Sequence, residues 1–171
     1  MIELDTILVP VDYSQRSYEA VDAAVRFARK FGAAITLLHV VKTASSPKVL
    51  RMQAGGEVDT THTKRLTRYC DKRLSEMLVD IDTTGVKKMD TVIIPGTPYI
   101  EIVRFAVEHD FDHIIMGSHG LKGIQHFLYG SVAEKVLQSA PCPVLVVKGP
   151  GFRHRVAGKT RVIKKADLDL D

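Results

Sequence analysis

Two hydrophobic patterns alternate along the chain. Short, nearly continuous apolar runs are typical of strands buried on both faces, whereas apolar residues recurring every three or four positions are typical of helices. Five runs of the first kind occur, at residues 5–11, 33–41, 89–95, 111–117 and 143–148. The pattern therefore predicts five buried strands.

Helical patterns separate these runs. Ser14 can cap a first helix and Gly32 can end it. The inner face of this helix is predicted to carry Val21, Ala24, Val25, Ala28 and Phe31. A second helix is predicted at 60–83, with Leu66, Cys70, Leu74, Met77 and Ile81 on its inner face. A third follows Gly96-Thr97-Pro98 and carries Ile100, Val103 and Val107, and a fourth spans 131–140. The polar segment 42–58 is predicted as a long loop.

Strands that alternate with helices indicate an α/β fold in three layers, a parallel sheet covered by helices on both faces. In such sheets, ligands bind beyond the carboxyl ends of the strands, where the strand order reverses. This points to the residues that follow the first and fourth predicted strands, namely Asp12 and the loop that begins at Gly117.

The loop after the fourth strand, MGSHGLKGIQHFLYGSVAEKV (116–136), is rich in glycine. Gly117, Gly120 and Gly123 are spaced by three, and Gly130-Ser131 precedes a predicted helix. Glycine lets backbone N–H groups approach a ligand, and a helix N-terminus adds unpaired N–H groups and a positive dipole end. These features favour a phosphate site. Plain turns, with Ser131 as a helix cap, are the alternative.

Other phosphate-binding motifs are absent. The Rossmann fingerprint needs glycines after the first strand, which here continues as ValAspTyrSer. The P-loop-like Gly158-Lys159-Thr160 lacks its upstream glycine, because Arg153 stands there. The third strand ends in Ile94-Pro95, where a receiver domain would need an Asp.

Gly117-x-x-Gly120, nine residues, and then Gly130-Ser131 resembles the ATP-binding signature of the universal stress protein family. Further segments resemble the same family: ILVPVDYS (7–14), LLHVV (37–41), Gly-x-Pro (96–98) and AlaProCysProValLeuValVal (140–147). The resemblance spans about residues 2–148 and implies one universal stress protein domain, residues 1–148.

The resemblance implies a flavodoxin-like, adenine nucleotide alpha hydrolase-like sheet of order 3-2-1-4-5, in the ATP-binding subgroup. It also implies the ligand contacts. The backbone of Val40 recognises adenine near Pro10 and Val11, and Met116 lines the pocket. Asp12 and Gly117 hold the ribose, and the phosphates are cradled by Gly120, Gly130, Ser131 and Val132. His119 either touches a phosphate or is solvated. Mg or Mn would be held mainly by the ATP phosphates.

Three functions stay open. An ATP-binding regulator or sensor of the stress response, with an unidentified protein partner, is the first. A slow ATP hydrolase is the second, although only Asp12 and His119 could position a water. An interaction module with an unoccupied nucleotide site is the third.

The resemblance also implies a homodimer paired through the fifth strand, whose apolar edge, 143–147, invites pairing.

Length and composition indicate the class of protein and its cellular compartment. The 171 residues suffice for one domain, no apolar run approaches the length of a membrane span, and no secretory signal is recognisable. Cys70 and Cys142 match neither a disulfide framework nor a metal spacing. We therefore expect a cytoplasmic protein with no membrane partner.

The charge lies at the C-terminus. Residues 148–171 hold seven Lys or Arg and three Asp, whereas residues 1–147 hold 17 basic and 17 acidic residues. A body without excess charge is a poor candidate for binding nucleic acid. The basic tail, 149–171, is either a disordered solubilising extension or a segment that docks on an anionic partner.

Overall fold

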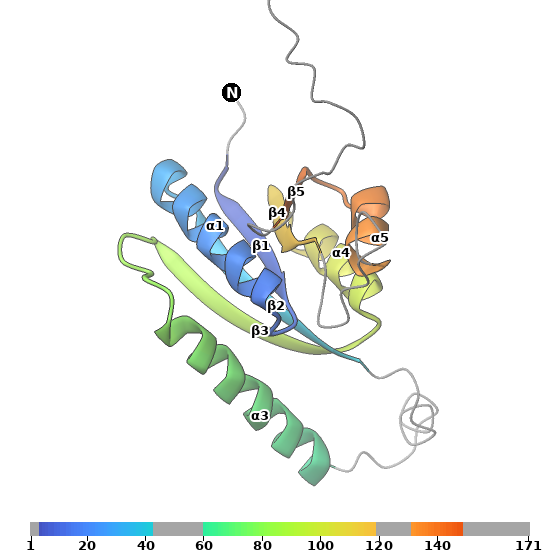
Figure 1. The fold of residues 1–171 in the computed structure, drawn as a ribbon. Helices are drawn as coiled ribbons and strands as arrows, with labels where there is room; N and C mark the ends of the chain where they lie inside the picture. The colour runs from blue at the N-terminus through green and yellow to red at the C-terminus, as the bar shows by residue number, and fades with distance from the viewer. Residues whose placement is uncertain (1–3, 43–59, 119–130, 149–171) are drawn as a thin grey trace, which may run out of the picture.

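The computed structural model describes residues 4–42, 60–118 and 131–148, and for residues 60–67 only the course of the backbone. These ranges contain one parallel sheet (Figure 1) of order β3-β2-β1-β4-β5. Its strands are β1 (Thr6–Val11), β2 (Ala34–Lys42), β3 (Lys88–Gly96), β4 (His113–Gly117) and β5 (Val144–Val147). The expected fold class and strand order are thus confirmed.

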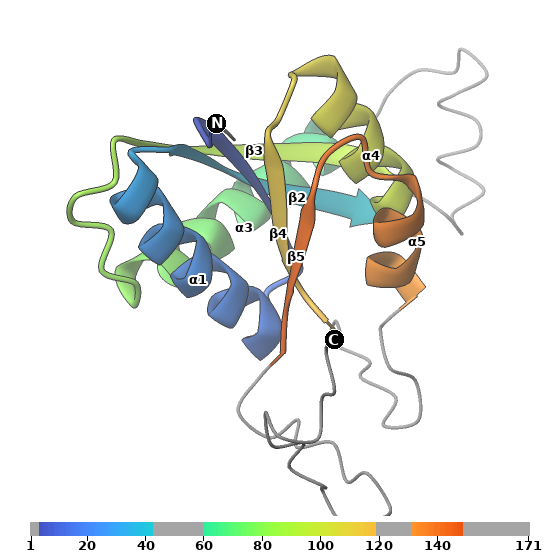
Figure 2. The same ribbon diagram turned by 90° about the horizontal axis from the view of Figure 1, so that it is seen from above.

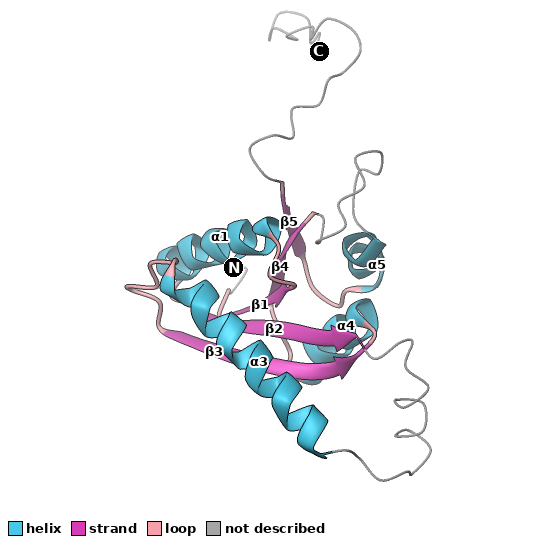
Figure 3. Ribbon diagram, turned by 60° about the horizontal axis from the view of Figure 1, so that its bottom comes forward, coloured by secondary structure: helices cyan, strands magenta, loops and turns pink. Residues whose placement is uncertain are grey.

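Helices cover both faces of the sheet, as predicted. The described helices are α1 (Gln15–Phe31), α3 (Thr60–Val79), α4 (Pro98–Glu108) and α5 (Ser131–Ser139). Helices α1 and α3 lie on one face, while α4 and α5 lie on the other. Seen from above (Figure 2), β4 and β5 run between α1 on one side and α5 on the other. Figure 3 shows that α3 extends past the sheet at its N-terminal end.

The sheet separates two apolar clusters. In β1, Ile7, Val9 and Val11 pack in the cluster beneath α1 and α3, while Leu8 packs in the cluster beneath α4 and α5. Successive side chains of a strand point to opposite faces, so a strand covered on both faces must be apolar throughout. This explains why β1 appears in the sequence as a continuous apolar run.

The ends of α1 follow the predicted capping. The Ser14 hydroxyl oxygen accepts a hydrogen bond from the Ser17 backbone N–H (3.3 Å). At the other end, Gly32 has a φ of +75°, a left-handed conformation that suits glycine. Ala20, Ala24 and Ala28 are all fully buried, and such small side chains let α1 approach the sheet closely. Local sequence signals therefore determine where this helix begins and ends.

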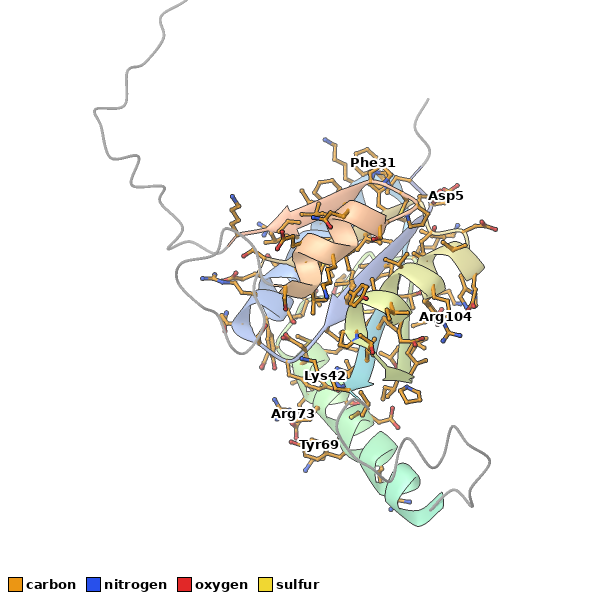
Figure 4. The ribbon with its side chains drawn as sticks, turned by 90° about the vertical axis from the view of Figure 1, so that its right-hand side faces the viewer. Asp5, Phe31, Lys42, Tyr69, Arg73 and Arg104 are labelled. Atoms are coloured by element: carbon orange, nitrogen blue, oxygen red, sulfur yellow. The ribbon has the colours of Figure 1, made fainter. Side chains whose placement is uncertain are left out.

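Two predicted helix faces were partly wrong. Phe31 is 51% exposed at the last position of α1, next to Asp5 and at the end of the sheet opposite Lys42 (Figure 4). In α4 the buried residues are Ile102 and Ala106, whereas Ile100 and Val107 are 46% and 55% exposed. The apolar arc of α4 is wider than the strip that contacts the sheet, and periodicity alone does not select the buried part.

The second predicted helix, α3, is shorter than expected. Cys70, Leu74 and Met77 are buried as predicted. The helix ends at Val79, and Ile81 packs against the core from the segment that follows it. The Leu66 side chain lies outside the described residues, as do most of the predicted loop 42–58 and the whole tail 149–171.

Asp112 joins the amino ends of β1 and β4. Its Oδ2 atom accepts hydrogen bonds from the backbone N–H groups of Asp5 (3.0 Å) and Thr6 (2.9 Å) and from the Thr6 hydroxyl (2.9 Å). Burial alone would raise the pKa of Asp112, but these hydrogen bonds hold that pKa below its usual 3.8. The contact therefore links the two adjacent strands β1 and β4, although the residues involved are more than 100 positions apart in the sequence.

Candidate functional site

Asp12 directly follows β1, and the first turn of α1 holds its carboxylate. Oδ1 accepts hydrogen bonds from the Ser14 backbone N–H (3.1 Å) and the Ser17 hydroxyl (2.6 Å). The Asp12 N–H in turn donates to the Ser17 Oγ atom (2.9 Å). A helix N-terminus also favours a nearby negative charge. A carboxylate is thereby held at the carboxyl end of β1, and the strand order reverses between β1 and its neighbour β4.

Tyr13 links this turn to α3. Its φ of +62° is uncommon for a bulky residue and costs about 1–2 kcal/mol. The hydroxyl donates to the Cys70 carbonyl oxygen of α3 (3.2 Å), and the Arg73 guanidinium lies 5.0 Å from the ring centroid. Burial raises the pKa of Tyr13 above its usual value, so the hydroxyl remains a donor at neutral pH. Figure 4 shows Arg73 beside Tyr69 on α3, and the Arg73 guanidinium donates a hydrogen bond to the Tyr69 hydroxyl oxygen (3.3 Å).

His39 of β2 braces the end of β1. Its Nδ1 atom lies 2.9 Å from the Val11 carbonyl oxygen, and its ring centroid lies 4.4 Å from that of Tyr13. Because a carbonyl oxygen can only accept, Nδ1 must carry the proton. Burial lowers the pKa of His39 below its usual 6.5, against the opposing influence of this hydrogen bond and the Asp12 charge. The ring is therefore neutral at pH 7.

Gly117 ends β4 in close contact with α1. A Cβ atom at this position would lie 2.7 Å from the Cβ of Arg16 and 2.8 Å from its carbonyl oxygen. Because one of these atoms belongs to the backbone of α1, a side chain could not be accommodated by a rotamer change. The end of β4 is thus packed against the same helical turn that holds Asp12.

The residues expected around adenine lie at the carboxyl ends of the three central strands. Pro10 and Val11 end β1 and are buried, and Val11 pairs in register with His39. Val40 follows His39 and is 8% exposed, while Met116 of β4 is 5% exposed. The side chains of Val40 and Met116 share the cluster beneath α4 and α5.

Two of the residues expected around the phosphates are described. Ser131 is exposed at the first position of α5, and Val132 packs in part against the core. Figure 2 shows that α5 begins at the end of the sheet where β4 finishes. His119, Gly120 and Gly130 lie outside the described residues.

Three residues of this region were not anticipated from the sequence: Tyr13, Ser17 and His39. Ser17 is only 4% exposed on the face of α1 that also carries Val21 and Ala24. A polar residue on a predicted buried face was the available signal for Ser17. The same signal, a polar residue inside an apolar run, was present for His39 in LLHVV.

No described group of three or more His, Cys, Asp or Glu side chains could hold a metal ion. Nor does any described helix combine the length and apolar character that crossing a membrane demands.

Comparison with known proteins gives concordant matches. The model of the Universal stress protein family matches residues 3–148. A universal stress protein of Methanocaldococcus jannaschii is 37% identical over 145 residues, which cover 84% of this chain and 82% of that protein.

Solved structures agree with this match. The universal stress protein UspA from Lactobacillus plantarum superposes with a TM-score of 0.71 at 26% identity, over 85% of this chain and 99% of that one. A universal stress protein from Archaeoglobus fulgidus, solved in complex with dAMP, gives 0.57 at 24% identity, over 86% and 100% of the two chains. A further universal stress protein, solved in complex with cAMP, gives 0.55 at 23% identity, over 85% and 97%.

Proposed function

The chain belongs to the universal stress protein family, and from this premise we propose that it is a regulatory or sensor protein that binds ATP at the carboxyl edge of its sheet. The observation that carries the proposal is the Asp12 carboxylate, held by the Ser14 N–H and the Ser17 hydroxyl at the strand-order reversal. Ligands of open α/β sheets bind at this position.

The proposed pose follows the family resemblance. Adenine contacts the backbone of Val40 between Pro10, Val11 and Met116, and the ribose contacts Asp12 and Gly117. The phosphates contact Gly120, Gly130, Ser131 and Val132, with His119 within reach, and carry Mg or Mn mainly on their own oxygens. Solved members of this fold with bound cAMP and dAMP support an adenine nucleotide as the ligand.

A sensor role is preferred over ATP hydrolysis. Positioning a water for attack needs a group near the γ-phosphate. In the proposed pose Asp12 contacts the ribose, and its Oδ1 atom already accepts two hydrogen bonds, so it is poorly suited to that task. We place the protein in the cytoplasm, where the unpaired thiols of Cys70 and Cys142 would stay reduced.

We also propose that the protein forms a homodimer through β5. The N–H of Ile114 in β4 donates to the Pro143 carbonyl oxygen, and the N–H of Ser118, just after β4, donates to the Val147 carbonyl oxygen (both 3.0 Å). Because alternate residues of a strand face the same neighbour, the backbone groups of Val144 and Val146 point to the outer edge of the sheet. That edge can pair with a second copy across a two-fold axis.

Isothermal titration of the full-length protein with Mg-ATP tests the nucleotide proposal. Gly130→Val places a side chain where the phosphates are expected and should abolish binding, with an unchanged circular dichroism spectrum. Equal affinity in the folded variant would remove the site assignment. Steady phosphate release by the wild type, lost in Ser131→Ala, would establish the hydrolase instead. If the purified wild type neither carries nor binds a nucleotide, an interaction module with an unoccupied site is the remaining function.

A further inference from the structure

Ser17 makes two reciprocal hydrogen bonds with one residue. Its Oγ atom accepts from the Asp12 backbone N–H (2.9 Å), and its hydroxyl proton is donated to Asp12 Oδ1 (2.6 Å). The side chain is almost completely buried, at 4% exposure. A hydroxyl has one proton to donate, and here that proton is directed at the carboxylate.

We infer that Ser17 is a positioning residue that fixes the Asp12 carboxylate for a ribose hydroxyl, so that the site prefers ribonucleotides to 2′-deoxyribonucleotides. The inference rests on the proposed function, in which Asp12 contacts the ribose. It goes beyond that function because it assigns the sugar preference of the site and the residue that sets it.

Helix capping does not account for Ser17. The cap of α1 is Ser14, whose Oγ atom accepts the Ser17 N–H. Ser17 instead lies among the buried residues of α1, and its hydroxyl both accepts the Asp12 N–H and donates to Asp12 Oδ1. The hydroxyl is therefore best explained by its contact with Asp12.

A fixed carboxylate discriminates better than a mobile one between a ribose and a 2′-deoxyribose. A site built to hydrogen-bond a substrate hydroxyl rejects the analogue without it, because the acceptor then loses its partner. A carboxylate free to rotate could find another donor or water, and that adjustment would reduce the penalty. Two donors on Oδ1, the Ser17 hydroxyl and the Ser14 N–H, restrict such a rotation.

The test compares the affinities of Mg-ATP and Mg-dATP by isothermal titration, using the full chain. The wild type should prefer ATP by about tenfold, the value of a hydrogen bond to a charged group. Ser17→Ala should reduce that preference by a factor of about five. A smaller folded fraction would weaken both affinities equally and leave their ratio unchanged.

Two further variants separate positioning from general loosening. Ser14→Ala removes the helix cap but keeps the backbone N–H that contacts Asp12, so the ATP-to-dATP ratio should stay at the wild-type value. Asp12→Ala should abolish the preference, and adding Ser17→Ala to it should change the ratio no further.

These measurements distinguish a failure of the proposed function from a failure of this inference. If the wild type binds neither nucleotide, the proposed function fails and this inference fails with it. If the wild type binds ATP and dATP equally, nucleotide binding stands but the sugar preference is wrong. If Ser17→Ala keeps the full wild-type ratio, or Ser14→Ala lowers it as much, Ser17 has no positioning role.

Discussion

The Nδ1 atom of His39 lies 2.9 Å from the carbonyl oxygen of Val11, so a side chain of β2 holds the last peptide of β1. That peptide immediately precedes Asp12. The orientation of the expected ribose contact thus depends on a histidine as well as on the first turn of α1.

This histidine should make stability depend on pH. The pKa of His39 in the folded chain lies below 6.5, so between the two values the unfolded chain binds a proton that the folded chain does not. The free energy of unfolding should therefore fall as pH drops below about 6.5. Urea unfolding at pH 8 and at pH 5.5 measures the difference.

His39→Gln should remove this part of the pH dependence. At pH 8 the variant should lose about 1 kcal/mol, the value of one hydrogen bond. On acidification it should lose less stability than the wild type. If both proteins lose the same amount between pH 8 and pH 5.5, His39 does not couple protonation to folding.

Gly117→Ala should destabilise the fold by about 1–3 kcal/mol, because its Cβ would overlap the backbone of Arg16. Gly32→Ala is a matched control, since no atom lies within 4 Å of a Cβ there and only the strain of φ +75° is incurred. That strain costs about 1–2 kcal/mol. Denaturant midpoints measure both variants. An unchanged midpoint for Gly117→Ala would mean that the contact with α1 adjusts without cost.

Val146→Pro should shift sedimentation toward the monomer. Proline removes the N–H that points to the outer edge of β5, whereas Val146→Ala keeps it and should remain dimeric. Sedimentation velocity at micromolar concentration measures both. A wild type that already sediments as a monomer would refute the dimer.

Truncation after Lys148 should leave the fold and the dimer unchanged. Residues 1–147 have no excess charge, so the tail would supply nearly all attraction to an anionic partner. Truncation should therefore remove salt-sensitive binding to heparin, used as a model polyanion. The same retention and salt dependence without the tail would show that it contributes nothing to such binding.

Most of the fold could be predicted from the sequence. Strands covered on both faces, such as β1 and β2, appear as apolar runs whatever their neighbours are, and Ser14 and Gly32 mark the ends of α1 through local chemistry. The buried face of α4 could not be predicted, because Ile100, Ile102 and Val107 are all apolar. Only the contact with the sheet selects Ile102.

The candidate site was predictable in outline. Asp12 could be identified because strand ends locate ligands in parallel sheets. Ser17 and His39 could not be assigned roles, because their contacts depend on a backbone turn and a strand register that periodicity does not contain. The unusual φ of Tyr13 likewise has no signature in the sequence.

The contact between Asp112 and Thr6 also bears on the order of assembly during translation. The strands β1, β2 and β3 are consecutive both in the chain and in the sheet, so they can assemble as soon as they leave the ribosome. The other edge of β1 stays unpaired until residues 112–117 emerge. Between these two events the nascent chain exposes the edge of its most buried strand, and this is the interval in which a chaperone would protect it best from aggregation.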